Sequence, residues 1–99
     1  MKRLITNARL VDGSGAPAYD ADVLVEGGRI AAIGTGLSAE GARQVEAAGR
    51  VLTPGFIDIH RHADLQPFLD QAEGEAPFAD HLLKQGITTI VNGNCGISH

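Results

Sequence analysis

The chain has 99 residues, with eight Lys or Arg and twelve Asp or Glu side chains, and a formal net charge of −4 at pH 7. This acidic balance argues against a nucleic-acid or anionic-membrane partner, since both require a basic patch. The hydrophobic content of 43% is ordinary for a globular protein with a modest core.

The cysteine content and the N-terminal segment predict a cytoplasmic location. Cys95 is the single cysteine of the sequence, which fits a reducing compartment. Lys2 and Arg3 are not followed by the apolar segment of a signal peptide, because Asn7 and Arg9 interrupt it. No apolar stretch approaches the roughly 20 residues of a membrane-spanning helix.

Residues 1–53 read as short strands separated by glycine-containing turns. The pair Gly27-Gly28 between two apolar runs is a hairpin signal. Many short strands with regular turns predict a small all-β unit, a sandwich or a partial barrel. The predicted strands cover residues 4–8, 9–11, 22–26, 29–33, 44–47 and 50–52.

Residues 54–99 predict a strand, a helix and a second strand. The nearly continuous apolar run at residues 56–60 is typical of a strand buried on both faces of a parallel sheet. A helix is expected over residues 77–85, ended by Gly86, with a β-branched strand at residues 87–91. This order is that of a right-handed βαβ unit with parallel strands, and the fold class is therefore mixed α/β.

His60, His62 and Cys95 are candidate metal ligands. The two histidines follow the first strand of the βαβ unit, and strand alternation would point both to one face, with Arg61 turned away. Cys95 follows the second strand, so all three are expected at one sheet edge. Two imidazoles and a thiolate suit zinc and leave a fourth position for water. Two polar residues at a strand end and an inert buried thiol are the alternative interpretation.

Two motifs carry a family resemblance. Residues 54–62, Pro-Gly-Phe-Ile-Asp-Ile-His-Arg-His, resemble the signature of the amidohydrolase superfamily, whose members are metal-dependent hydrolases on a (β/α)8 TIM barrel. Residues 86–98 are similar to the N-acyl-D-amino-acid deacylases (D-aminoacylases), which use a cysteine as a metal ligand where relatives commonly use a carboxylated lysine. The resemblance covers essentially the whole chain. It implies a small β-domain in residues 1–53 and the first β-α-β unit of an incomplete barrel in residues 54–99.

The resemblance also implies a function. The expected protein is the N-terminal fragment of a hydrolase that cleaves amide C–N bonds of small-molecule N-acyl-D-amino acids with metal-activated water and one or two Zn2+ ions. His60 and His62 would be first-strand ligands, and Cys95 a bridging or primary ligand. The aspartate general base is expected beyond residue 99, so no catalytic residue is assigned here and the 99 residues alone are expected to be inactive. Arg61 and Ala63 depart from the family pattern.

Alternatives remain from the same sequence. A cyclic-amide hydrolase of the dihydroorotase or hydantoinase kind is the second enzyme candidate, and Cys95 argues against it. A truncated, non-catalytic metal-binding β-domain is the candidate from another class. The partner would then be a second copy in a homo-oligomer, or else the remainder of the same enzyme.

Four other polar side chains have local roles predicted. Asp58 is expected to hydrogen-bond backbone rather than orient a ligand histidine, and Asp64 is divided between the metal-site periphery and a helix N-cap. His81 and Glu46 are expected to be solvated.

Overall fold

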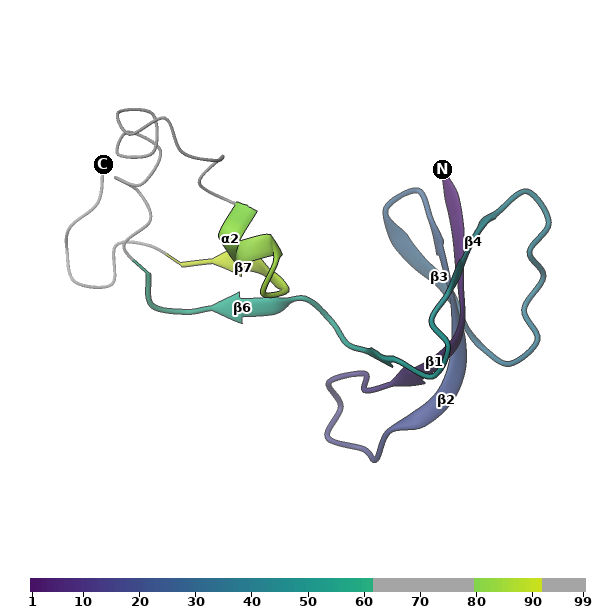
Figure 1. Cartoon of the computed structure of the whole chain (residues 1–99), viewed down its shortest axis with the longest axis horizontal. Coiled ribbons are helices and arrows are strands. Elements are labelled where there is room, and N and C mark those ends of the chain that lie inside the picture. The colour runs from purple at the N-terminus through teal and green to yellow at the C-terminus, as the bar shows by residue number, and fades with distance from the viewer. Residues whose placement is uncertain (62–79, 92–99) are drawn as a thin grey trace. The chain divides into compact units, whose positions relative to one another are not determined.

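The computed structural model describes residues 1–61 and 80–91, and the elements in these ranges are mostly strands with little helix (Figure 1). The chain divides into two compact units, Met1–Pro54 and Gly55–His99. Within the described ranges, no helix has the length and apolar composition needed to cross a membrane. Asp64, His62 and Cys95 lie outside these ranges.

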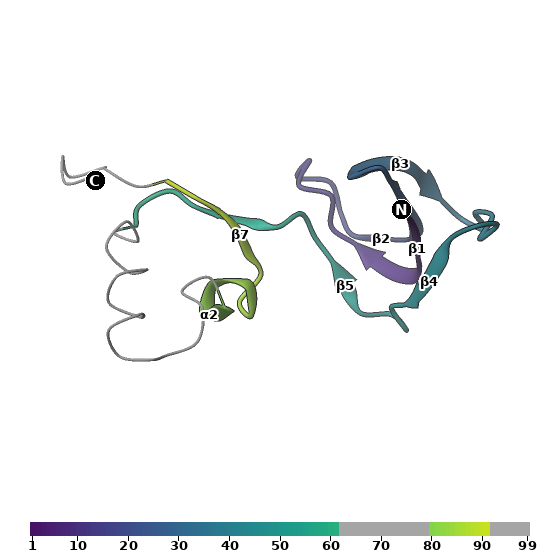
Figure 2. The same cartoon turned by 90° about the horizontal axis from the view of Figure 1, so that it is seen from above.

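One five-stranded sheet forms the first unit. Its central strand β1 lies between β2 on one side and β4 on the other, with β3 beyond β2, and β5 also pairs with β1. The pairs β1–β2 and β2–β3 are antiparallel, whereas β4 and β5 run parallel to β1. Figure 2 shows the sheet as curved rather than flat. The strands are β1 (Lys2–Leu10), β2 (Tyr19–Glu26), β3 (Arg29–Gly34), β4 (Arg43–Glu46) and β5 (Val51–Leu52).

The predicted hairpin is confirmed at Gly27 and Gly28. Both residues have positive φ, 58° and 76°, in the left-handed region that a two-residue primed turn requires. Glu26 pairs with Arg29 across the turn. Because glycine adopts this conformation without steric cost, the pair sets the register of β2 against β3 beside the turn, and this register shifts between Val25 and Leu24.

The two strands predicted at residues 4–8 and 9–11 are one strand, so that expectation was wrong. Asn7 has φ 55°, and the register with β2 shifts between Ile5 and Ala8. The Asn7 N–H donates to Asp22 Oδ1 at 3.0 Å, which holds the irregular residue in place. A β-bulge therefore replaces the predicted break. The described strands of this unit form one sheet, so the second sheet of a sandwich stays a prediction.

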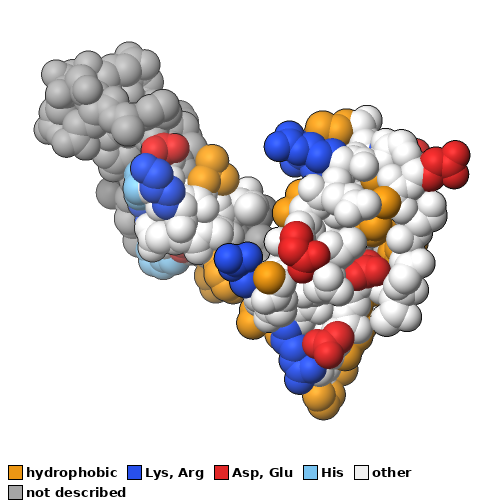
Figure 3. Space-filling view, turned by 45° about the vertical axis from the view of Figure 1, so that its right-hand side comes forward, with side chains coloured by type: hydrophobic (Ala, Val, Ile, Leu, Met, Phe, Trp, Pro, Cys, Tyr) orange, Lys and Arg blue, Asp and Glu red, His pale blue; other side chains and the backbone are white. Residues whose placement is uncertain are grey.

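The core of the first unit is aliphatic and small. Leu10 of β1 forms a buried cluster with Ala21 and Val23, which are alternate residues on one face of β2. Leu4 is also buried, but it pairs with Leu24 and so lies on the opposite face, because the bulge at Asn7 shifts the alternation of β1. Hydrophobic side chains also remain on the surface (Figure 3), and Ile30 and Val51 are both about two-thirds exposed, at 66% and 64%.

Glu46 joins β4 to β1, although it was predicted to be only a solvated charge. Its carboxylate accepts hydrogen bonds from Thr6 Oγ1 at 3.0 Å, from Asn7 Nδ2 at 2.9 Å and from the Ala48 N–H at 2.7 Å. The Ala48 backbone bond, followed by the Asn7 and Thr6 side chains, lowers the pKa of Glu46 from its ordinary 4.5. An exposed acid thus satisfies the polar groups beside the β1 bulge.

The second unit contains a parallel strand pair and a short helix. Strands β6 (Phe56–Asp58) and β7 (Ile87–Ile90) pair in parallel, and helix α2 (Asp80–Leu83) comes before β7 in the chain. Gly86 follows the helix with φ 79°, and its N–H donates to the Leu83 carbonyl at 2.9 Å. The predicted parallel pairing and the glycine cap are both confirmed. Residues 77–79 of the predicted helix lie outside the described ranges.

Strand β6 is shorter and more exposed than predicted. It ends at Asp58, and Phe56 and Ile57 are 57% and 62% exposed, not buried on both faces. The physical reason is that β6 pairs with β7 alone among the described strands. Leu82 of α2 is the buried hydrophobic residue of the described part of this unit, at 4% exposure.

Gly55 lies at a close approach between the start of β6 and β7. A Cβ atom built on Gly55 would overlap the Thr88 side chain and lie 2.8 Å from Thr88 Cβ. The next residue, Phe56, donates its N–H to the Gly86 carbonyl at 2.8 Å. The glycine of the Pro-Gly-Phe motif is therefore required by space rather than by its φ angle.

We predict that Gly55→Ala destabilises the second unit by about 1–3 kcal/mol, the usual cost of overpacking. The measurement is urea unfolding of the full-length protein. Thr88→Ala in the same chain removes the two nearest side-chain atoms and should recover part of the loss. If the double variant lost as much unfolding free energy as the two single variants together, the close approach would be contradicted.

We predict that Glu46→Gln lowers the unfolding temperature near neutral pH and flattens its dependence on pH. The pKa of Glu46 is lowered in the folded state, so its contribution is present above about pH 4.5 and is lost as pH falls through the folded-state pKa. Thermal unfolding from about pH 7 to about pH 3 tests this.

The matched control is Glu40→Gln. The Glu40 carboxylate makes no hydrogen bond or ion pair with any residue in the described ranges. This substitution should leave the pH profile unchanged, and a Glu46→Gln profile identical to that of the control would contradict the assignment.

Candidate metal centre

The carboxyl ends of β6 and β7 lie side by side. Asp58 pairs with Ile90, and the Val91 N–H donates to the Asp58 carbonyl at 2.9 Å. Three residues further on, the Arg61 N–H donates to the Val91 carbonyl at 3.2 Å. The chain that carries His60 therefore runs along the exit of β7, at the edge where parallel βα proteins place functional groups.

His60 occupies a bend after β6 and not the strand itself. Its N–H donates to Asp58 Oδ1 at 3.2 Å, which forms a local turn at the strand end. The expectation that strand alternation orients this histidine was wrong, because regular pairing of β6 stops at Asp58. The residue is exposed.

The predicted triad is described only at His60. His62 and Cys95 lie outside the described ranges, so their assignment as ligands stays a prediction. Within residues 1–61 and 80–91, no three His, Cys, Asp or Glu side chains gather as a metal site.

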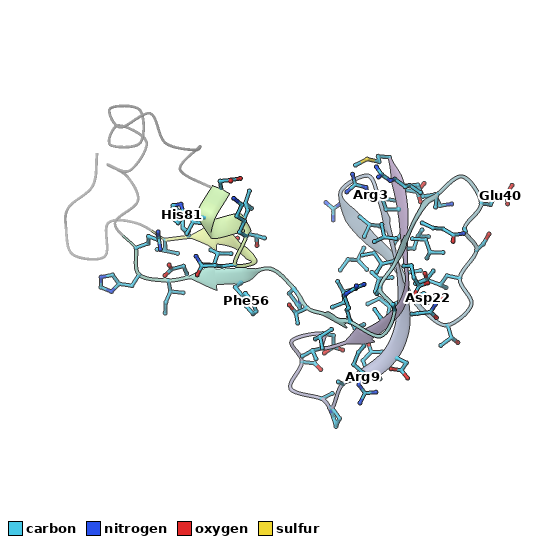
Figure 4. All side chains as sticks on the ribbon, viewed as in Figure 1. Arg3, Arg9, Asp22, Glu40, Phe56 and His81 are labelled. Carbon is cyan, nitrogen blue, oxygen red and sulfur yellow. The ribbon has the colours of Figure 1, made fainter. Side chains whose placement is uncertain are left out.

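Arg61 contacts side chains of two other elements. Its Nη2 lies 2.9 Å from Nε2 of His81 in α2, and its Nη1 lies 3.6 Å from Asp58 Oδ2 at the end of β6. The side chain is partly buried, with 31% exposure. Figure 4 shows the labelled His81 beside the chain segment that leaves β6.

Asp58 and His81 both have the surroundings predicted for them, and each also contacts Arg61. Asp58 accepts a backbone hydrogen bond from His60, as expected, and also pairs with Arg61. His81 is exposed, as expected, but it contacts Arg61. Sequence reasoning missed this contact because it joins residues 20 positions apart. The available signal was the βαβ order, which brings the helix against the strand that precedes it.

Comparison with known proteins gives a consistent class. No family model matches the chain. The N-acyl-D-aspartate deacylase of Alcaligenes xylosoxydans xylosoxydans is 45% identical over 95 residues, which cover 96% of this chain and 18% of that protein. A shorter match to the dihydroorotase of Streptomyces coelicolor is 48% identical over 61 residues, 62% of this chain and 13% of that protein.

Solved structures agree with the sequence matches. A D-aminoacylase studied for its binuclear metal centre superposes with a TM-score of 0.78 at 43% identity, covering 97% of this chain and 19% of that one. The N-acyl-D-glutamate deacylase of Bordetella bronchiseptica, solved with zinc and a phosphonate inhibitor, superposes with a TM-score of 0.70 at 42% identity, covering 96% of this chain and 19% of that one.

The likeness is therefore to metal-dependent amidohydrolases. Within that class, the resemblance to the N-acyl-D-amino-acid deacylases is confirmed over nearly the whole chain. The chain spans about a fifth of the length of these deacylases.

We predict that neutral His81 carries its proton on Nδ1. A guanidinium group offers only donors, so the Nε2 atom that faces Arg61 Nη2 has to accept. The 15N chemical shifts of the ring at alkaline pH distinguish the two tautomers. In the Arg61→Ala variant, the fraction of the Nδ1–H tautomer should fall. Predominant Nε2–H imidazole in the unmodified protein would contradict the contact.

Proposed function

We propose that this chain is the N-terminal part of a zinc-dependent amidohydrolase that hydrolyses the amide bond of N-acyl-D-amino acids. The observation that carries the proposal is the parallel pairing of β6 with β7. It places the segment containing His60 against Val91, four residues before Cys95. The similarity to deacylases supports the same substrate class, a small N-acylated amino acid.

His60, His62 and Cys95 fit zinc by the chemistry of their donor atoms. Neutral imidazole nitrogen and thiolate sulfur are both common zinc ligands, and three protein ligands leave a position for water or substrate. Zinc, when bound, would lower the pKa of a water molecule and polarise the amide carbonyl. The residues described around this edge would orient the ligands: Asp58 holds the His60 backbone, and Arg61 holds the Val91 carbonyl.

We propose that Gly55–His99 supplies the first βαβ unit of a (β/α)8 barrel. The parallel β6–β7 pair and the helix α2 before β7 support this arrangement. Such a barrel takes about 250 residues, and the general base and the groups that hold the substrate carboxylate would come from other strands of it. Met1–Pro54 would belong to the small β-domain of the same enzyme, as part of a sandwich.

A reducing compartment suits this site, and we place the enzyme in the cytoplasm. The proposed ligand Cys95 has to be a thiolate to bind metal, and oxidation would remove it.

Cyclic-amide hydrolysis is the second candidate, favoured by the shorter dihydroorotase match. Its substrates are closed rings, whereas deacylase substrates carry an open acyl amide and a free carboxylate. The deacylase resemblance covers more of the chain and includes the segment with Cys95.

We predict that Cys95→Ala and His62→Ala in the full-length protein each remove stoichiometric zinc. They should lower kcat/KM for N-acyl-D-amino acids by more than about 100-fold, since losing even the partners of a metal ligand costs about 10–100-fold. Metal analysis and deacylation kinetics, with the L-isomers and a cyclic amide as comparison substrates, measure both effects.

The matched control is His99→Ala, a histidine four residues after Cys95 that is not assigned to the metal. Full zinc content in Cys95→Ala would remove that residue from the ligand set. Faster turnover of the cyclic amide than of any N-acyl-D-amino acid would favour the second candidate. Zinc without any hydrolysis would indicate a non-catalytic metal-binding domain.

A further inference from the structure

We propose that Arg61 is a positioning residue for the metal centre, holding the segment that carries His60 and His62 in one place. The inference rests on the proposed function, because the value of a fixed segment lies in the two ligands that flank Arg61. The side chain itself points to Asp58 and His81, and the proposal gives it no contact with metal or substrate.

Arg61 is tied to three elements at once. Its backbone N–H donates to the Val91 carbonyl beyond β7 at 3.2 Å. Its Nη1 is 3.6 Å from Asp58 Oδ2 at the end of β6, and its Nη2 is 2.9 Å from His81 Nε2 in α2. One residue thus links both strands of the βαβ unit to its helix.

The same network reaches His60 directly. Asp58 offers one carboxylate oxygen to Arg61 and the other to the His60 N–H, at 3.6 and 3.2 Å. The Asp58 carboxylate therefore contacts both the His60 backbone and the Arg61 side chain in the turn that follows β6. Because Arg61 follows His60 directly in the chain, fixing its backbone and side chain restricts His60, and we propose the same effect on His62.

The chemistry of the guanidinium explains why arginine serves here. It is planar and presents several donors in fixed directions, so Nη1 and Nη2 can engage Asp58 and His81 together. A lysine ammonium is a single point of charge and cannot span both groups in the same way. The 31% exposure of the side chain and the 27% exposure of Asp58 reduce the screening of this pair by water.

The positive charge of Arg61 acts against its positioning role, and Asp58 offsets that charge. A permanent cation beside a metal site opposes binding of Zn2+ unless an anion compensates it. Asp58 lies against the guanidinium and provides that anion. Asp58→Asn should therefore weaken zinc binding in two ways, through looser positioning and through an uncompensated positive charge.

The test measures zinc affinity by chelator competition in the full-length protein. Arg61→Ala should weaken zinc binding by about 10–100-fold, the range seen for residues that orient metal ligands. The zinc affinity of Arg61→Lys should fall between those of the unmodified protein and Arg61→Ala, because lysine keeps the positive charge but lacks the two separate guanidinium donors. At saturating zinc, Arg61→Ala should retain its KM and show a lowered kcat.

His81→Ala should weaken zinc binding in the same direction as Arg61→Ala but less. The double variant should be no weaker than Arg61→Ala alone, because both substitutions break one contact. The matched control is Lys84→Ala, which removes the 2.8 Å Lys84–Asp80 ion pair of the same helix and should leave zinc affinity unchanged.

Three results would overturn the proposal. Unchanged zinc affinity in Arg61→Ala, with zinc bound by the unmodified protein, removes the positioning role and leaves the proposed function intact. If Arg61→Ala does not fold, unchanged affinity in Arg61→Lys removes the positioning role in the same way. No zinc in the unmodified protein refutes the proposed function, and this inference with it.

Discussion

The parallel pairing of β6 with β7 is the constraint on which the second unit depends. Two short strands that are far apart in the chain share hydrogen bonds at both ends of the pair. At the start, Phe56 donates to the Gly86 carbonyl, and at the finish, Val91 donates to the Asp58 carbonyl. Because the strands are parallel, their exits meet, and polar groups that are distant in sequence come to one edge.

Features encoded in neighbouring residues could be predicted from the sequence. The hairpin at Gly27-Gly28 and the cap at Gly86 depend on positive φ, which glycine alone adopts at no cost. The roles of Asn7 and Glu46 could not be predicted, because their hydrogen bonds cross 39 positions of the chain. Nothing near Glu46 in the sequence distinguishes it from a solvated acid.

The candidate site divides in the same way. The turn in which Asp58 accepts the His60 N–H spans two residues and follows from local chemistry. The contact of Arg61 with His81 depends on where the helix lies, which neither motif encodes. The prediction that β6 is buried was wrong for a related reason. An apolar run indicates that a strand needs neighbours on both faces, but it does not identify the elements that cover it.

Gly55 has a consequence for the histidine that follows five residues later. The space beside Thr88 has no room for a Cβ atom, so residue 55 can lie this close to β7 only if it is glycine. Any larger residue would push the strand outward or slide it along its neighbour, and either displacement would carry His60 with it. The position of the candidate ligand His60 thus depends on the absence of a side chain at Gly55.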